Sequence, residues 1–480
     1  MGLSAVTPPS PRAVPRPLPG SLLAWLASRL DAVLPAGNPV ATLRLALYLG
    51  GVACFGGVQL LAPYVRPGLV RHGAILAIMA LLFCGLALFT LCCCSAMPGP
   101  LRALAPHGRR LAILGFGLIL PLAVHGAGQL AAVPAGLAQP RHYQNDAVTI
   151  TSCATDLFLR GRDPYADFSV VDCFTRHGLT GRYTTPLRAG AFAGVAIYPS
   201  RPQLEAAFAR ARAARQQHPR EFESYFSYPA GAFLLTAPFV ALGWRDLSSF
   251  YLVCLLGCYA LLAWWAPRRW RPWLLPIALA NIALWDQVVS GSSDALDLFL
   301  ILAAWTTWRR PWLSALLMGA ALAARQQSWF FAVFWIVLVA RAGGPRAALR
   351  RVAVMAAVFG LLNLPFVLHS PQAWLHGVLG PLLDPMFPLG AGLIGLVVHG
   401  WLPLGPRGLY SALQLAALGA CVLWYARACC RHPGAGLALA LVPLAFGWRS
   451  LLTYFVALPI YCLWPLLHDL RASPLAAGDG

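Results

Sequence analysis

The stretch 73–96 decides the fold class, because it reads GAILAIMALLFCGLALFTLCCCSA and holds no charged residue. A helix that crosses a bilayer needs about 20 mainly apolar residues, and this stretch is long enough. Two similar stretches flank it, at 40–62 and 111–133. Because lipid offers backbone groups no hydrogen-bond partners, chain at this depth is expected to be helical. The sequence therefore predicts three membrane-spanning helices near its start.

The composition extends this prediction to the whole chain. Its 480 residues are 59% hydrophobic and 11% charged, whereas soluble domains carry about 25% charged residues. This excludes a soluble globular enzyme. Further candidate spans lie at 228–243, 247–266, 272–289, 293–308, 312–324, 328–340, 352–369, 387–402, 408–426, 434–447 and 450–467. Since some are short or interrupted by proline, we expect an all-α polytopic membrane protein with about 11–14 transmembrane helices.

One long polar segment (134–227) interrupts the apolar runs. It contains all three glutamates, Glu205, Glu221 and Glu223. We expect it to form a large first outer loop with short helices. The predicted organisation is a disordered proline-rich tail with an interfacial helix (1–38), N-terminal transmembrane helices (39–133), the long polar segment, a C-terminal transmembrane bundle (228–470) and a cytoplasmic tail (471–480).

The positions of the arginines indicate how the chain is oriented in the membrane. The net charge is +20, but the basic residues, all arginine, punctuate apolar runs, which is typical of cytoplasmic loops rather than of nucleic-acid binding. The clusters are Arg102, Arg109, Arg110; Arg268, Arg269, Arg271; Arg309, Arg310; Arg341, Arg346, Arg350, Arg351; and Arg427, Arg431. If these are cytoplasmic, the long polar segment lies outside a cell membrane. This parity requires that one of the two stretches 228–243 and 247–266 be re-entrant or only half cross, and we expect it to be 228–243, which contains Pro238.

Two cysteines lie in the long polar segment, Cys153 and Cys173. In an oxidising compartment they either form a disulfide or remain two unpaired thiols, and the sequence leaves both open.

Ionisable side chains at the expected outer helix ends need partners or a water-filled cavity. They are Asp286, Asp294, Asp297 and Arg325. Each costs roughly 2.5–3.5 kcal/mol when buried in the bilayer centre. They either hold helices together or line a polar site.

Several short stretches stand in a recognisable order. They are Tyr143-Gln-Asn145-Asp146, Tyr225-Phe-Ser-Tyr228-Pro229, Arg325-Gln326-Gln-Ser-Trp329, Asn363-Leu-Pro365-Phe366 and Trp448-Arg449-Ser450. Together they resemble the C-type glycosyltransferase superfamily (GT-C), in particular its polyprenyl-phosphate-dependent family 87 group. The resemblance covers roughly residues 110–470 and implies a GT-C-like helical bundle.

The resemblance implies an inverting transfer of a sugar from a polyprenyl phosphate to an envelope lipid or glycan acceptor. Asp146 matches the superfamily's catalytic base, which removes the acceptor's hydroxyl proton. Arg325 and Arg449 match cations that would stabilise the leaving phosphate. Residues expected to bind substrate are Asn145, Tyr228, Asp294, Arg325, Gln326 and Arg449. We expect no cofactor and no metal, because ligand spacings are absent, and no nucleic-acid partner.

Each of the main candidate site residues also has an interpretation in which it has only a structural role. Asp146 is otherwise a loop carboxylate or a helix cap, and Arg325 and Arg449 are otherwise anchors at the membrane surface. The alternative function is a transporter or lipid flippase with Asp286, Asp294, Asp297 and Arg325 along a polar path. A scaffold without catalysis is the third possibility. A shared cavity for Asp146 and the two arginines would discriminate among them.

Overall fold

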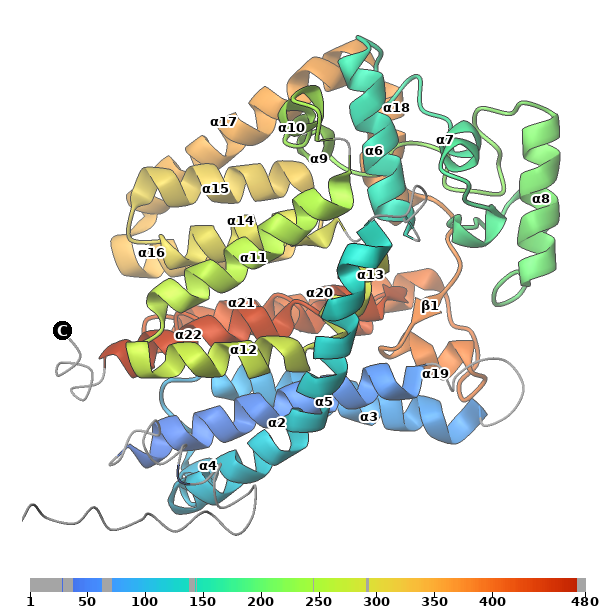
Figure 1. The fold of residues 1–480 in the computed structure, drawn as a ribbon. Coiled ribbons are helices and arrows are strands. Elements are labelled where there is room, and N and C mark those ends of the chain that lie inside the picture. The colour runs from blue at the N-terminus through green and yellow to red at the C-terminus, as the bar shows by residue number, and fades with distance from the viewer. Residues whose placement is uncertain are drawn as a thin grey trace, which may run out of the picture.

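The computed structural model describes residues 28, 38–62, 71–137, 143, 145–244, 246–290 and 293–472. In these ranges the chain is mostly helical, and the sheet found there has two strands, β1 (Leu389–Gly390) and β2 (Arg449–Ser450). The fold is all-α, as predicted (Figure 1). The predicted tail and interfacial helix lie almost wholly outside the described residues, as do residues 473–480.

Six described helices are long and apolar enough to cross a membrane, so the chain is a polytopic membrane protein. They are α2 (Pro39–Leu61), α3 (Arg71–Cys92), α5 (Gly108–Leu137), α11 (Leu247–Trp265), α17 (Pro345–His369) and α20 (Arg407–Ala428). Among the first three, α2 packs against both α3 and α5. All three coincide with the predicted N-terminal spans. Shorter helices complete the C-terminal part: α12 (Arg271–Ala280), α13 (Ile282–Ser290), α14 (Asp294–Thr306), α15 (Pro311–Ala324), α16 (Ser328–Gly343), α18 (Pro371–Leu383), α21 (Ala435–Leu439) and α22 (Leu458–Ala472).

Several predicted spans are not single continuous helices in the structure. The stretch 272–289 is divided between α12 and α13, and 434–447 and 450–467 each contain a short 3₁₀ segment. The stretch 228–243 forms two short helices, α9 (Gly231–Leu234) and α10 (Ala237–Ala241), rather than one continuous helix. The prediction of a span at 387–402 is wrong, because this stretch contains β1 and the five-residue helix α19 (Ile394–Val398). Gly390, at φ +130°, takes a backbone conformation that a helix does not use.

The long polar segment forms a small unit with its own core. Its helices are α6 (Asp146–Leu159), α7 (Val170–Arg176) and α8 (Arg201–Ala213). Cys153 and Cys173 are joined by a disulfide between α6 and α7, with Cα atoms 5.9 Å apart, which settles the open alternative. The core also includes Val378 of α18 and Phe387. This unit is therefore packed onto the C-terminal bundle.

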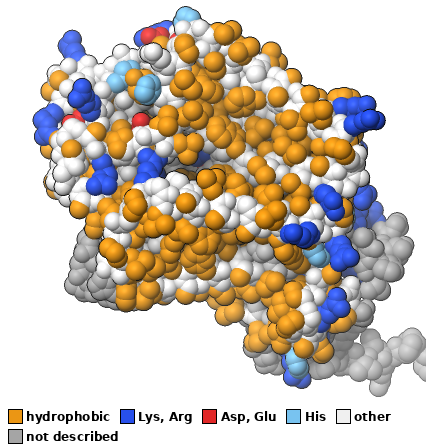
Figure 2. Space-filling view, turned by 180° about the vertical axis from the view of Figure 1, so that it is seen from behind, with side chains coloured by type: hydrophobic (Ala, Val, Ile, Leu, Met, Phe, Trp, Pro, Cys, Tyr) orange, Lys and Arg blue, Asp and Glu red, His pale blue; other side chains and the backbone are white. Residues whose placement is uncertain are grey.

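Different elements form the two ends of the molecule. In Figure 1, α7 and α8 lie at one end and the C-terminus lies at the other. Arg471 Nη1 donates to the carbonyl of Trp264, and Arg351 Nη1 donates to the carbonyl of Trp308, so several basic helix ends gather away from α7 and α8. Figure 2 shows basic side chains at the edges of a broad hydrophobic area, which is hollowed near its boundary with the more polar part.

Candidate functional site

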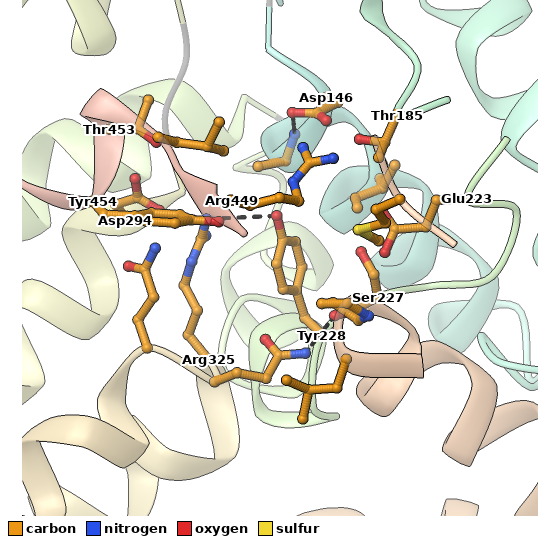
Figure 3. Close-up of a pocket in the computed structure, with 18 of the residues that line it drawn as sticks. Asp146, Thr185, Glu223, Ser227, Tyr228, Asp294, Arg325, Arg449, Thr453 and Tyr454 are labelled. Atoms are coloured by element: carbon orange, nitrogen blue, oxygen red, sulfur yellow. Dashed lines mark hydrogen bonds and ion pairs between the residues drawn. The ribbon is translucent and has the colours of Figure 1, made fainter. Parts of the chain in front are cut away.

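A cavity of about 340 Å³ lies where the long polar segment meets the C-terminal bundle. Its walls come from the start of α6, the end of the long polar segment, the start of α14, the turn between α15 and α16, the end of α18, and β2 (Figure 3). All seven residues predicted from the sequence line this cavity: Asn145, Asp146, Tyr228, Asp294, Arg325, Gln326 and Arg449. The structure therefore brings together groups that are up to three hundred residues apart.

Asp146 is the first residue of α6. The side chain of Asn145 caps this helix, and its Oδ1 accepts from the backbone N–H of Ala147 at 2.8 Å. Oδ1 of Asp146 accepts from the same N–H, also at 2.8 Å. Burial raises the pKa of the Asp146 carboxyl, while the Ala147 N–H and the charges of Arg449 and Arg325 oppose the rise. The result is a partly desolvated carboxylate that faces cations.

Arg325 ends α15 with an extended backbone, which turns the chain towards α16. Its Nη2 lies 2.5 Å from Oδ1 of Asp294, the first residue of α14. Its Nη1 donates to the hydroxyl of Ser293, and its Cζ lies 4.6 Å from the ring centre of Tyr228. An ion pair, a hydrogen bond and a cation–π contact thus fix this guanidinium at the cavity wall.

Gln326 and Tyr228 hold the wall together. Nε2 of Gln326 donates to the carbonyl of Ser227 at 2.6 Å and to that of Val378 at 3.0 Å. The carbonyl of Tyr228 accepts from the hydroxyl of Tyr165 at 2.8 Å. These bonds connect the end of the long polar segment with the α15–α16 turn and α18, so both residues have a structural role in addition to lining the cavity.

Arg449 is positioned by the small sheet. β1 and β2 are parallel, with Leu389 opposite Arg449 and Gly390 opposite Ser450. A Cβ on Gly390 would lie 2.0 Å from the carbonyl oxygen of Ser450, so only glycine allows this approach. Nη1 of Arg449 is buried and has no hydrogen-bond partner. Its guanidinium therefore retains a donor for an anionic ligand.

Sequence reasoning did not single out Glu223 as a site residue. Glu223 lines the cavity with Thr185 and Ser227, and its Oε1 is buried without a hydrogen-bond partner. Burial raises its pKa to about 7; Arg449 opposes this rise, and Asp146 and Asp384 add to it. The only sequence signal was its place in the acid-rich segment shortly before Tyr228.

Asp297, another acidic residue of the predicted polar path, does not line this cavity. Asp297 is buried in α14 and lines a separate cavity of about 10 Å³ beside Arg325. That volume accommodates about one water molecule. The side chain of Asp286 lies outside the described part of the chain.

Comparisons with known proteins do not identify a family: no protein-family model matches the chain, and no curated protein or solved structure does so significantly. The cavity is therefore the feature of the chain that indicates a function. A partly buried carboxylate near two guanidiniums, one of which has a spare donor, can remove a proton next to a bound anion.

Proposed function

We propose that this chain is an integral membrane glycosyltransferase. It transfers a sugar from a polyprenyl-phosphate donor to an envelope lipid or glycan acceptor, with inversion and without a metal ion. The reaction takes place on the extracytoplasmic side of the cell membrane. The observation that carries the proposal is that Asp146, Arg325 and Arg449 line one cavity.

The chemistry of transfer fits these three groups. Displacement at the anomeric carbon with inversion needs a base for the acceptor hydroxyl on the face opposite the leaving group. Asp146 supplies this carboxylate. The leaving lipid phosphate gains negative charge as the glycosidic bond breaks, and Arg325 and Arg449 stabilise that charge. Arg449 Nη1, buried without a partner, gives the phosphate oxygen a donor that costs no existing hydrogen bond.

The transporter hypothesis receives less support from the same region. A polar path would continue from Arg325 towards Asp297, but the cavity between them has a volume of about 10 Å³. The larger cavity instead has carboxylates and guanidiniums arranged around one space, and the disulfide between Cys153 and Cys173 braces the helix that begins with Asp146. These features favour chemistry at a fixed site over a translocation route.

Replacing Asp146 by Asn tests the proposal, because Asn keeps the shape and removes the base. Membranes that contain the variant, supplied with a polyprenyl-phosphate sugar, should transfer sugar about 10²–10⁴-fold more slowly than wild type. The amount of folded protein should be unchanged. Asp156→Asn is the matched control, since Asp156 belongs to the same helix and does not line the cavity. Full activity in Asp146→Asn would refute the base assignment.

A further inference from the structure

Glu223 and two hydroxyl residues form a distinct part of the cavity. In Figure 3, Thr185, Glu223 and Ser227 lie on one side, whereas Asp294 and Arg325 lie on the opposite side. The backbone N–H of Glu223 donates to the carbonyl of Thr185 at 2.9 Å, which fixes the two residues relative to each other. The Ser227 side chain lies close enough to the Glu223 carboxyl to lower its pKa.

The rest of the chain holds this part of the cavity in place. Pro186 pairs with Phe222, and Leu187 pairs with Met386, as isolated antiparallel bridges. The backbone N–H of Arg188 donates to the carbonyl of Pro385 at 2.7 Å. Glu223 is therefore preorganised, and its unpartnered Oε1 is not the result of a loose loop.

A buried acceptor without a partner costs free energy, so a ligand that donates to it is favoured. A phosphate does not fit, because two anions repel each other. A cationic ligand is disfavoured by Arg449, whose charge acts directly on Glu223. A neutral hydroxyl group fits, because it donates to the carboxylate, and the hydroxyls of Thr185 and Ser227 can exchange hydrogen bonds with neighbouring hydroxyls.

We propose that Glu223, with Thr185 and Ser227, binds hydroxyl groups of the acceptor sugar and so selects a neutral polyhydroxylated acceptor. This inference rests on the proposed glycosyl transfer. It places the acceptor on the wall away from Arg325, next to Asp146, whose charge acts on Glu223. The lipid phosphate then occupies the opposite wall, where Arg325 lies.

Ligand binding to the full-length protein in phosphatidylcholine nanodiscs tests this division. The probes are farnesyl phosphate, for the phosphate wall, and three neutral sugars: methyl α-mannoside, methyl β-glucoside and methyl α-arabinofuranoside. Trp448 lines the cavity, so tryptophan fluorescence can follow binding. At about pH 8, above the Glu223 pKa of about 7, the carboxyl is ionised, so Glu223→Gln should weaken the tightest-binding glycoside about tenfold because a charge-assisted hydrogen bond is lost. Its affinity for farnesyl phosphate should change by less than about twofold.

Two matched variants separate the walls. Glu221→Gln makes the same substitution two residues away, outside the cavity lining, and should leave both affinities unchanged. Arg449→Gln should weaken farnesyl phosphate binding more than glycoside binding. The inference is overturned if Glu223→Gln binds glycosides as wild type does, or if wild type binds none of them saturably. Since the assay needs no turnover, its outcome is independent of whether Asp146→Asn retains transfer.

Discussion

At the scale of single residues, the titration of Glu223 makes the free energy of unfolding depend on pH in a predictable direction. Its pKa in the folded protein is about 7, above the ordinary value of 4.5, so the folded state binds this proton more tightly than the unfolded chain. The free energy of unfolding therefore falls as pH rises from 4.5 to about 7. The size of this pKa shift also depends on the neighbouring groups that act on the Glu223 carboxyl, which are Arg449, Asp146, Asp384 and Ser227.

Glu223→Gln removes this titration. Between about pH 5 and about pH 8, the variant should gain up to about 3 kcal/mol of unfolding free energy relative to wild type. Denaturation of the detergent-solubilised protein, followed by circular dichroism across this range, measures the difference. Glu221→Gln should keep the wild-type profile. Parallel profiles for Glu223→Gln and wild type would mean that Glu223 does not retain its proton in the folded protein.

Asp146 and Glu223 differ in how well the sequence predicts that they line the cavity. Asp146, Arg325 and Arg449 stand within short motifs, so residue type and order were enough to predict that they meet. Glu223 has no motif of its own. Its position depends on the bridge between Pro186 and Phe222, a contact between distant segments that no local pattern predicts.

At the scale of secondary-structure elements, hydrophobic runs predicted the long helices. The same signal gave a wrong prediction where two short strands pair instead. The run 387–402 is apolar enough to suggest a helix, yet β1 pairs with β2 there. The pairing depends on Gly390, and its partner was not visible in the sequence because it lies about sixty residues later. The same pairing positions Arg449, so one strand pair explains both the wrongly predicted span and the place of Arg449 in the cavity wall.

Gly390→Ala tests this coupling. The added Cβ would collide with the carbonyl of Ser450, so β2 must shift and Arg449 with it. Farnesyl phosphate binding should weaken about tenfold, as for a lost charge-assisted hydrogen bond, with unchanged helical content by circular dichroism. Gly400→Ala is the control, because Gly400 also has a positive φ, +79°, but open space around it. Wild-type affinity in Gly390→Ala would show that the strand pair does not position the guanidinium.

At the scale of the whole molecule, the hydrophobic area lies between a polar end with α7 and α8 and an end where basic helix termini gather (Figures 1 and 2). Short basic loops are retained on the cytoplasmic side of membranes. The long polar segment would then face outwards, where a disulfide such as Cys153–Cys173 persists. The basic helix ends and the disulfide therefore predict the same orientation.

Labelling with a membrane-impermeant maleimide tests this orientation in whole cells. Gln216, exposed after α8, is replaced by Cys, and Cys430, exposed after α20 beside Arg431, serves as the internal reference. The new cysteine should be modified in intact cells, whereas Cys430 should react only after permeabilisation, as read by mass spectrometry of the labelled peptides. Cys430→Ser identifies the reference signal. The reverse order of labelling would place Asp146 on the cytoplasmic side, where the proposed transfer to an envelope acceptor could not occur.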